Sequence, residues 1–454
     1  MPVALVALVG VTLTHAMPAM AQGARATGIA EQFEARAKER ALRRQAAPTI
    51  PDIQGRQQGG DARPLLVLNA VEIEGASVLT RSEMGTAYHA YLGKSVSEAD
   101  LRRLTSHISE LYRQRGYALT RAFVPAQDVK HGRIRIQVLE GYIDEIVLEG
   151  TGRDDFGVRA MLAAITHERP LRLATLERHL LLASDTPGLR IQDTALEEKG
   201  EATGRFRLIV RLETWRMFAS VDLDNRGSPD TGPLQSFVAT ALNSALVPGD
   251  SWAVNYATVP DSPEELAYLG GVVEFPLGPK GARIGLKASS SSIRPDDDAS
   301  SVDARIRTHE LGMYMSYAPL RTREASLKFT ALAGLRNAHE DDSSGTVYDD
   351  HTRAVSLSAE YQQRDSYGGA NYAVLTGRIG LPILGASDSG EAPIVYPRCF
   401  WRVLQSVLGP DAIPKSRWRV VRAAVHDRSI GFLCAAAIRR LLPLAGRCLV
   451  APLP

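Results

Sequence analysis

The stretch Val355-Ser-Leu-Ser-Ala-Glu-Tyr361 places an apolar side chain at every second position. Arg283-Ile-Gly-Leu-Lys-Ala-Ser289 does the same. A period of two is that of a β-strand with one apolar and one polar face, and it recurs about nine times between residues 218 and 386. A bilayer leaves no water for main-chain groups, so strands cross it only as a closed barrel. We therefore expect residues 217–386 to form about nine strands of a transmembrane antiparallel β-barrel in an outer membrane.

Charge and cysteine divide the chain into a body and a tail. The chain has 454 residues with a formal charge of +2, 53 Lys and Arg against 51 acids. Residues 395–454 hold 10 Lys and Arg and 2 acids, which leaves 43 and 49 for residues 1–394. All 3 cysteines, Cys399, Cys434 and Cys448, also lie in the tail. A cysteine-free body suits an oxidising export compartment.

The N-terminus resembles a secretory signal. An apolar run from Val3 to Leu13 precedes Ala19-Met20-Ala21, which fits the small-x-small cleavage pattern. The usual positive start is missing, which leaves the true start codon open. We expect residues 1–21 to be a signal peptide, with an ordinary buried helix as the alternative.

Two further segments precede the folded body. Residues 27–46 have high helix propensity and charge around most of the helix, which indicates a solvated helix. Residues 47–63 are rich in Pro, Gly and Gln and predict a flexible linker.

Two α/β modules follow at 64–141 and 142–216. In the first, Val67–Ile73 and Arg133–Leu139 predict strands, and 81–92 and 97–115 predict helices, with Ser97 as an N-cap. In the second, 143–148 is a strand, 157–165 and 171–183 are helices, and 189–196 with 204–213 form a hairpin. The order β-α-α-β-β is thus repeated.

Several motifs in this order resemble the two-partner secretion transporters, the haemolysin activation/secretion family. VEIEGASVLT (71–80), the Gly116-Tyr117 pair and Pro125-Ala-Gln-Asp128 are similar to its first POTRA domain. VDLDNRGSPDTGPLQ (221–235), PGDSW (248–252) and DSYGGANY (365–372) are similar to the start of its barrel. The resemblance covers roughly residues 28–386 and implies an α+β POTRA pair ahead of an outer-membrane barrel.

The resemblance also implies a function. Members of the family export one large β-helical partner, which carries an N-terminal secretion domain, through a sixteen-stranded barrel without a cofactor. The 27–46 helix would be the plug, with Glu31, Phe33, Glu34, Arg36, Arg40, Arg43 and Arg44 on it. An unfolded client would add a strand to a POTRA sheet edge. Arg102, Arg103, Tyr112 and Arg113 are candidate partner-binding residues, with a solvated helix face as the alternative.

The sequence contains none of the common motifs for catalysis or metal binding that we sought. The G-x-S-x-G, P-loop and H-E-x-x-H motifs are absent. Asp296–Asp298 and the acidic stretch that begins at Asp341 lack the full ligand series of a calcium loop. We expect no enzyme activity, no metal and no nucleic-acid partner; outer-membrane lipid and the barrel-assembly machinery are the expected surroundings.

The strand alternation stops after Ala386. Residues 387–454 are rich in Arg, Pro and Cys, and the V-R-G-Y/F loop motif of the family is absent. We expect a non-barrel tail that arises where translation leaves its frame between Ala386 and Tyr396, with a divergent C-terminal domain as the alternative. On this interpretation the chain is a truncated and inactive transporter.

Two other functions remain open. A periplasmic POTRA module could bind a client without forming a pore. The second alternative is an outer-membrane protein insertase. The two POTRA units and the plug-like helix favour the transporter over this alternative.

Overall fold

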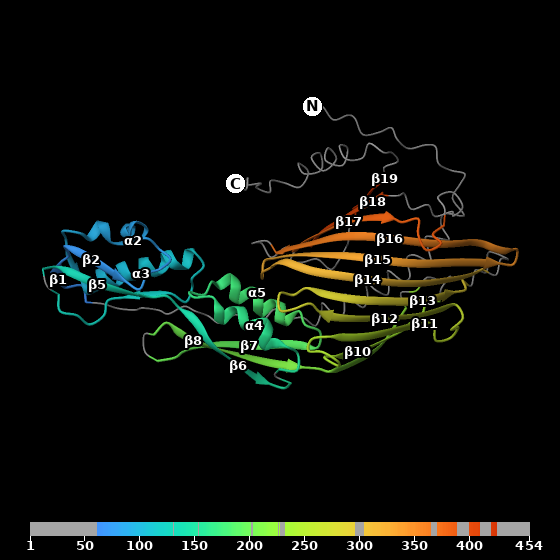
Figure 1. Cartoon of the computed structure of the whole chain (residues 1–454), viewed down its shortest axis with the longest axis horizontal. Helices are drawn as coiled ribbons and strands as arrows, with labels where there is room; N and C mark the ends of the chain where they lie inside the picture. The colour runs from blue at the N-terminus through green and yellow to red at the C-terminus, as the bar shows by residue number, and fades with distance from the viewer. Residues whose placement is uncertain are drawn as a thin grey trace, which may run out of the picture.

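The computed structural model describes residues 61–129, 131–152, 154–200, 203–225, 227, 232–295, 304–364, 370–387, 399–408 and 419–424. Two α/β units lie end to end and lead into one large antiparallel sheet (Figure 1). The expected signal peptide, the plug helix with its seven named residues, most of the linker and most of the tail lie outside the described residues.

The first α/β unit, residues 61–141, packs its helices on a small sheet. Its elements are β1 (Pro64–Val67), β2 (Ala70–Glu74), α2 (Arg81–Tyr88), the 3₁₀ turn η1 (His89–Tyr91), β3 (Ser95–Ser97), α3 (Glu98–Gln114), β4 (Arg121–Phe123) and β5 (Arg133–Leu139). The sheet order is β2-β5-β4, with β2 parallel and β4 antiparallel to β5. Buried Leu104 and Ile108 of α3 share a core with Ile134 and Ile136 of β5.

Both helices of this unit begin at capping boxes. Thr80 caps α2 with Glu83, and Ser97 caps α3 with Asp100, so each cap hydroxyl accepts from a backbone N–H while the acid accepts from the N-cap N–H. Gly116 then ends α3 with a φ of 87°. The N-cap expected at Ser97 is confirmed.

The single strand expected over Val67–Ile73 is wrong, because the chain breaks there into β1 and β2. Leu68 turns into the core, where it is fully buried. The N–H groups of Asn69 and Ala70 both donate to Gly132 O, at 2.7 and 3.3 Å. The break therefore lets β1 pair with β3 while β2 pairs with β5.

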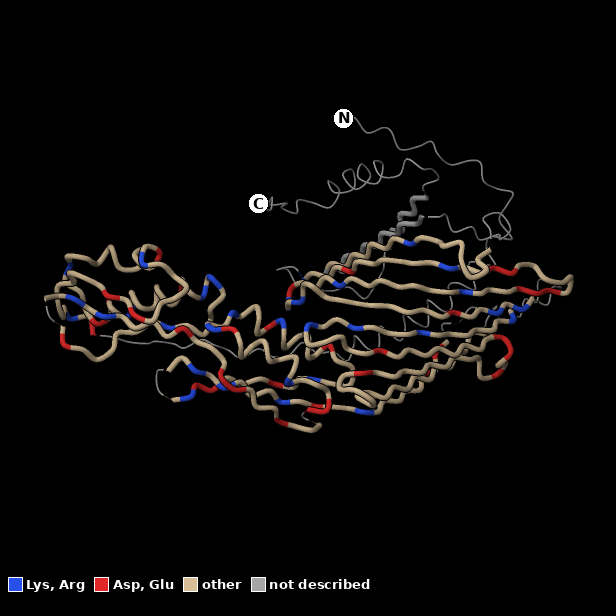
Figure 2. Tube along the Cα trace, viewed as in Figure 1, with Lys and Arg blue, Asp and Glu red and all other residues tan. Residues whose placement is uncertain are grey.

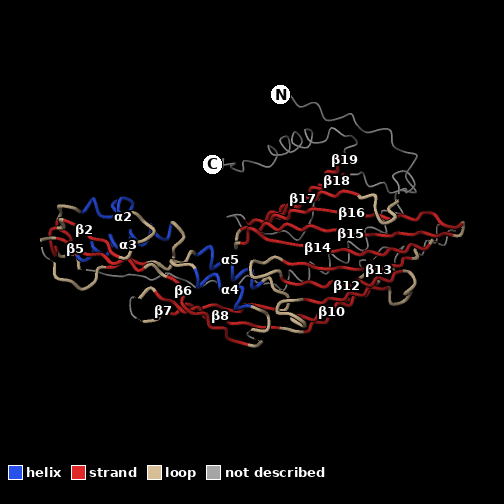
Figure 3. The backbone as a smooth tube through the Cα atoms, in the orientation of Figure 1, coloured by secondary structure: helices blue, strands red, loops and turns tan. Residues whose placement is uncertain are grey.

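The second α/β unit, residues 142–216, repeats the arrangement. Its elements are β6 (Tyr142–Gly150), α4 (Val158–His167), α5 (Leu173–Ser184), β7 (Leu189–Glu198) and β8 (Arg205–Thr214). The order β6-β8-β7, with β6 parallel and β7 antiparallel to β8, matches that of the first unit. Figure 3 shows its helices on one side of its strands. All five elements lie where the sequence predicted them.

The large sheet contains eleven antiparallel strands among the described residues, each paired with its neighbours in chain order. They are β9 (Met217–Asp224), β10 (Gln235–Asn243), β11 (Ser251–Thr258), β12 (Leu266–Pro276), β13 (Arg283–Ile293), β14 (Arg305–Arg321), β15 (Ala325–Asp342), β16 (Gly345–Arg364), β17 (Ala370–Gly380), β18 (Cys399–Leu408) and β19 (Arg419–Ala424). The nine strands expected over 217–386 are β9–β17. Within the described residues β9 and β19 do not pair, so the sheet is open.

Strands β18 and β19 lie in the segment where the sequence predicted no strands. They extend the sheet beyond β17 through main-chain pairing. A main-chain ladder needs no particular side-chain pattern, so the loss of alternation did not exclude pairing.

The two faces of the large sheet differ in polarity. On one face, the apolar face, Leu286, Met313, Val355 and Leu357 are exposed. Leu286 lies opposite Met313 across β13 and β14, so these side chains form rows across the sheet. The other face, the polar face, carries charged residues such as Glu310. Figure 2 shows few charges along the middle of the strands and more at their ends. This is the polarity of a sheet that faces lipid.

Candidate functional site

The candidate partner-binding residues of α3 divide into two groups. Arg102, Arg103 and Arg113 are exposed, and each pairs with an acid on its own helix, at 2.5 Å to Glu98, 2.8 Å to Asp100 and 2.6 Å to Glu110. Exposed pairs of this kind contribute little to the free energy of folding, so these guanidinium groups can exchange partners at a small cost in free energy.

The fourth candidate, Tyr112, is not on that surface. Its side chain is fully buried in the first unit, and its hydroxyl donates to Glu140 Oε1 at 2.7 Å. The prediction of Tyr112 as a partner-binding residue is therefore wrong in this structure. The sequence did hold the signal, since Tyr112 follows Leu104 and Ile108 at helical spacing on the core face of α3.

Glu140 is the centre of a compact polar cluster. It accepts hydrogen bonds from the N–H groups of Ser77 and Val78, at 2.7 and 3.0 Å, from the Ser77 hydroxyl and from Tyr112. Burial raises the pKa of Glu140, but the hydrogen bonds from Ser77, Tyr112 and Val78 outweigh it and hold the pKa below its usual value. Burial likewise raises the pKa of Tyr112. The cluster joins the end of β5 to the turn before α2.

The edges of the two small sheets are the places where an added strand could pair. In the first unit, β4 is only three residues long. Beyond it, Gln127 replaces a strand: its amide donates to Arg135 O and accepts from Arg135 N, both at 2.8 Å. This explains the Pro125-Ala-Gln-Asp128 motif, whose glutamine closes the edge of β5.

The second unit presents a longer edge. Strand β7 has ten residues and, among the described strands, pairs only with β8. A register shift between Ile191 and Asp193 marks a bulge in it. An extended chain could add to this edge through main-chain hydrogen bonds, with the bulge restricting the register.

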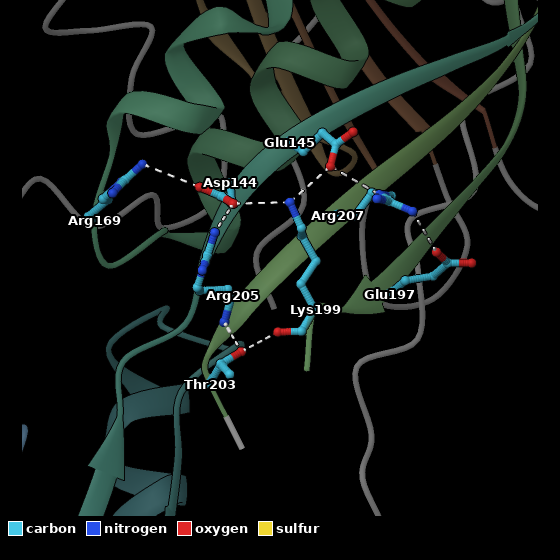
Figure 4. Close-up of polar contacts among 8 residues, drawn as sticks. All are labelled: Asp144, Glu145, Arg169, Glu197, Lys199, Thr203, Arg205 and Arg207. Carbon is cyan, nitrogen blue, oxygen red and sulfur yellow. Dashed lines mark hydrogen bonds and ion pairs between the residues drawn. The ribbon is translucent and has the colours of Figure 1, made fainter. Parts of the chain in front are cut away.

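A network of ion pairs fixes the β7–β8 hairpin to the start of β6 (Figure 4). Asp144 contacts Arg205 at 2.7 Å and Lys199 at 3.3 Å, and Glu145 contacts Lys199 at 3.0 Å and Arg207 at 3.2 Å. Hydrogen bonds from Arg205 and Lys199 lower the pKa of Asp144, and those from Lys199 and Arg207 lower the pKa of Glu145. Because charges of both signs neutralise each other here, the network has the character of a structural clamp.

The two α/β units are joined by an apolar residue and by polar bridges. Leu119 of the first unit is buried within the core of the second. Arg121 of β4 contacts Glu198 of β7 at 2.6 Å, and Leu173 N–H donates to Gly116 O at 2.8 Å. Buried Leu119 therefore couples the two units mechanically.

The PGDSW motif forms the β10–β11 turn and touches the second unit. Asp250 is fully buried, and its carboxylate accepts hydrogen bonds from the N–H groups of Ala245, Leu246 and Val247, at 2.6, 2.9 and 3.1 Å. A Cβ added at Gly249, where φ is 84°, would lie 3.4 Å from the main chain of Phe156. The motif thus packs the sheet against Phe156 and Gly157, the residues just before α4.

The described residues were also searched for a metal site and for a membrane-spanning helix. No group of three or more His, Cys, Asp or Glu side chains in them is placed to hold a metal ion. No helix among them is long and apolar enough to cross a membrane.

Comparison with known proteins supports the resemblance seen in the motifs. Residues 66–141 match the family model described as POTRA domain, ShlB-type. The heme/hemopexin transporter protein HuxB of Haemophilus influenzae is 24% identical over 294 residues, 63% of this chain and 50% of that protein. The outer membrane transporter CdiB of Escherichia coli is 26% identical over 216 residues, 47% of this chain and 36% of that protein. The chain thus spans half or less of these two relatives.

A solved structure agrees on the fold. CdiB from Escherichia coli aligns with a TM-score of 0.63 at 19% identity, covering 88% of this chain and 75% of that one. The expected architecture is confirmed as a POTRA domain followed by a large antiparallel sheet of the barrel type.

Proposed function

We propose that this chain, as a homologue of two-partner secretion transporters, serves in the bacterial outer membrane to export one large partner protein. The inactive, truncated transporter expected from the sequence of the tail is the competing hypothesis, and a measurement of export decides between the two. The observation that carries the proposal is the direct connection of two α/β units, the first a ShlB-type POTRA domain, to a sheet with one exposed apolar face. Such a face suits lipid, and the α/β units suit the periplasm.

The α/β units would capture the partner before transport. An unfolded N-terminal secretion domain can add to the open edge of β7, where main-chain groups supply affinity with little demand on sequence. Arg102, Arg103 and Arg113 would add electrostatic selection for an acidic segment, because their present partners are weak exposed pairs on one helix. Export in this scheme involves no catalytic chemistry.

The remaining parts follow from the resemblance and stay proposals. The 27–46 helix would close the lumen at rest, after removal of residues 1–21, and the barrel-assembly machinery would insert the sheet. The individual cores of the two units also support the simpler alternative, a periplasmic module that binds a client without a pore.

A binding experiment tests capture. Residues 61–216 contain two buried cores and should fold alone. Calorimetry should show that this fragment binds the N-terminal domain of a large exported protein encoded beside its gene. The Arg103→Ala/Arg113→Ala variant should bind more weakly while unfolding at the same urea concentration. Arg133→Ala, an exposed arginine on β5 away from α3 and from the β7 edge, is the control, and equal binding by all three proteins would remove α3 from the proposal.

A further inference from the structure

Besides its contact with the β10–β11 turn, the second α/β unit is attached to the large sheet at two separate places. One is the covalent connection from β8 to β9, where Asn243 N–H donates to Arg216 O at 2.7 Å and the Asn243 amide donates to Trp215 O at 3.1 Å. The other lies between α5 and the β14–β15 connection, far along the chain. A unit held at one place can rotate about it, whereas two attachments fix its orientation.

The second attachment begins with a bulge in β14. Tyr317 pairs with Phe329 and Leu320 pairs with Leu327, so Ala318 and Pro319 together oppose one residue of β15. Proline has no N–H for a ladder, which favours this irregularity. The bulge leaves the carbonyl groups of Ala318 and Pro319 available, and Arg178 of α5 donates to them at 2.9 and 2.8 Å.

A second arginine crosses the same interface in the opposite direction. Arg321, two residues after the bulge, donates through Nε and Nη2 to the two carboxylate oxygens of Asp185, both at 2.7 Å. Asp185 is the C-cap of α5. The pair is bidentate and only partly exposed, with side-chain exposures of 24% and 34%, which places it among the stronger ion pairs.

Asp185, Ala318 and Arg321 of these two contacts also line a cavity of about 360 Å³. Met161, Leu182 and Thr186 of the second unit form one wall, and Glu274, Arg283, Lys328 and Glu360 of the large sheet are among the residues of the other. Lys328 lies opposite Glu360 across β15 and β16. Their neighbours Phe329 and Leu357 point to the apolar face, so Lys328 and Glu360 point to the polar face. The cavity therefore opens onto the polar face, beside the α/β units.

We propose that Arg178 and Arg321 form a latch that holds the second α/β unit across this end of the polar face, and that an extended segment of the exported protein enters the cavity when the latch opens. The inference rests on the proposed function for the identity of the occupant. The carbonyls of Ala318 and Pro319 are main-chain acceptors that an extended chain could use through its own N–H groups. A client would thus compete directly with Arg178 for these two carbonyl groups.

Hydrogen–deuterium exchange on the full chain in detergent tests the latch without any client. Arg178→Ala and Arg321→Ala should each speed exchange in peptides over 173–186 and 316–326 by about ten-fold, the loss expected for hydrogen bonds to a charged group. Peptides over 61–141 should be unchanged, and Arg190→Ala is the control. The double variant Asp185→Arg/Arg321→Asp should restore slow exchange. Unchanged exchange in both single variants, or no recovery in the double variant, would overturn the latch.

Cross-linking in cells tests the occupant separately. A photoreactive benzoylphenylalanine at Leu182 should cross-link to the exported protein during export, and more strongly in the Arg321→Ala background. Active export with no cross-link at Leu182 would exclude the cavity from the route. If this chain supports no export, the proposed function fails, while the exchange experiment still decides whether the latch exists.

Discussion

Replacing Tyr112 by phenylalanine should destabilise the first α/β unit mainly through the lost hydrogen bond to Glu140. The ring is fully buried, so phenylalanine fills the same space, and the 2.7 Å bond to Glu140 disappears together with the contacts of the hydroxyl with the main chain of Leu79 and Val78. A hydrogen bond to a charged group contributes about 1.5–3 kcal/mol to the free energy of unfolding. With a urea m-value of about 2 kcal/mol per molar, the midpoint should fall by about 0.75–1.5 M.

The measurement is urea unfolding of residues 61–216, followed by fluorescence and circular dichroism. Tyr88→Phe is the matched control, because among the described residues Tyr88 makes a ring contact with His89 and its hydroxyl has no hydrogen bond. A shift below about 0.2 M for Tyr112→Phe, with an unchanged m-value, would show that the hydrogen bond to Glu140 does not stabilise the unit.

The same variant carries a pH prediction with a definite sign. The folded pKa of Glu140 lies below its ordinary value of 4.5, so this group stabilises the fold above pH 4.5. That stabilisation is lost as the pH falls through the lowered pKa and the carboxylate becomes protonated. The difference between wild type and Tyr112→Phe should therefore be full at pH 7 and shrink below pH 4.5.

Three further predictions concern other links of the structure. Leu119→Ala should lower the free energy of unfolding of residues 61–216 by about 2–4 kcal/mol, because it removes the apolar side chain between the two units. It should also divide urea unfolding into two transitions, and a single unshifted transition would count against this. Ser97→Ala should cost about 1 kcal/mol in the same assay through loss of the α3 cap, and an unchanged midpoint would argue against the capping role. Met313→Arg places a charge on the apolar face, which should destabilise the membrane-inserted state by about 2–4 kcal/mol and so reduce the inserted fraction. Ser289→Arg, opposite Glu310 on the polar face, should not, and equal insertion of both variants would contradict the assignment of faces.

The elements of the fold were largely predictable because each carries a strong local period. The second α/β unit and the nine strands β9–β17 follow from helical or alternating apolar positions. The break at Leu68 and Asn69 was not predictable, since it depends on contacts with Gly132 more than sixty residues away. Strands β18 and β19 also escaped prediction, because main-chain pairing leaves no side-chain signature.

The candidate site was predicted less well, for a physical reason. The exposed arginines of α3 were found from charge, but Tyr112 required the full helical pattern to recognise its burial. Gln127 and the Arg178 contact to the β14 bulge act on main-chain groups brought close only by the fold. A sequence period reports which face of an element is apolar, and it carries no information on such long-range contacts.

The proposed role of this chain in exporting one partner protein across the outer membrane can be tested in cells. Its most direct test is to delete the gene and measure how much of the large exported protein encoded beside it reaches the cell surface, by protease accessibility on intact cells. If the chain exports the partner, the partner should be lost from the cell surface and accumulate inside the envelope, while unrelated outer-membrane proteins stay at normal levels. Unchanged surface exposure of the partner in the deletion strain would exclude this role for the chain.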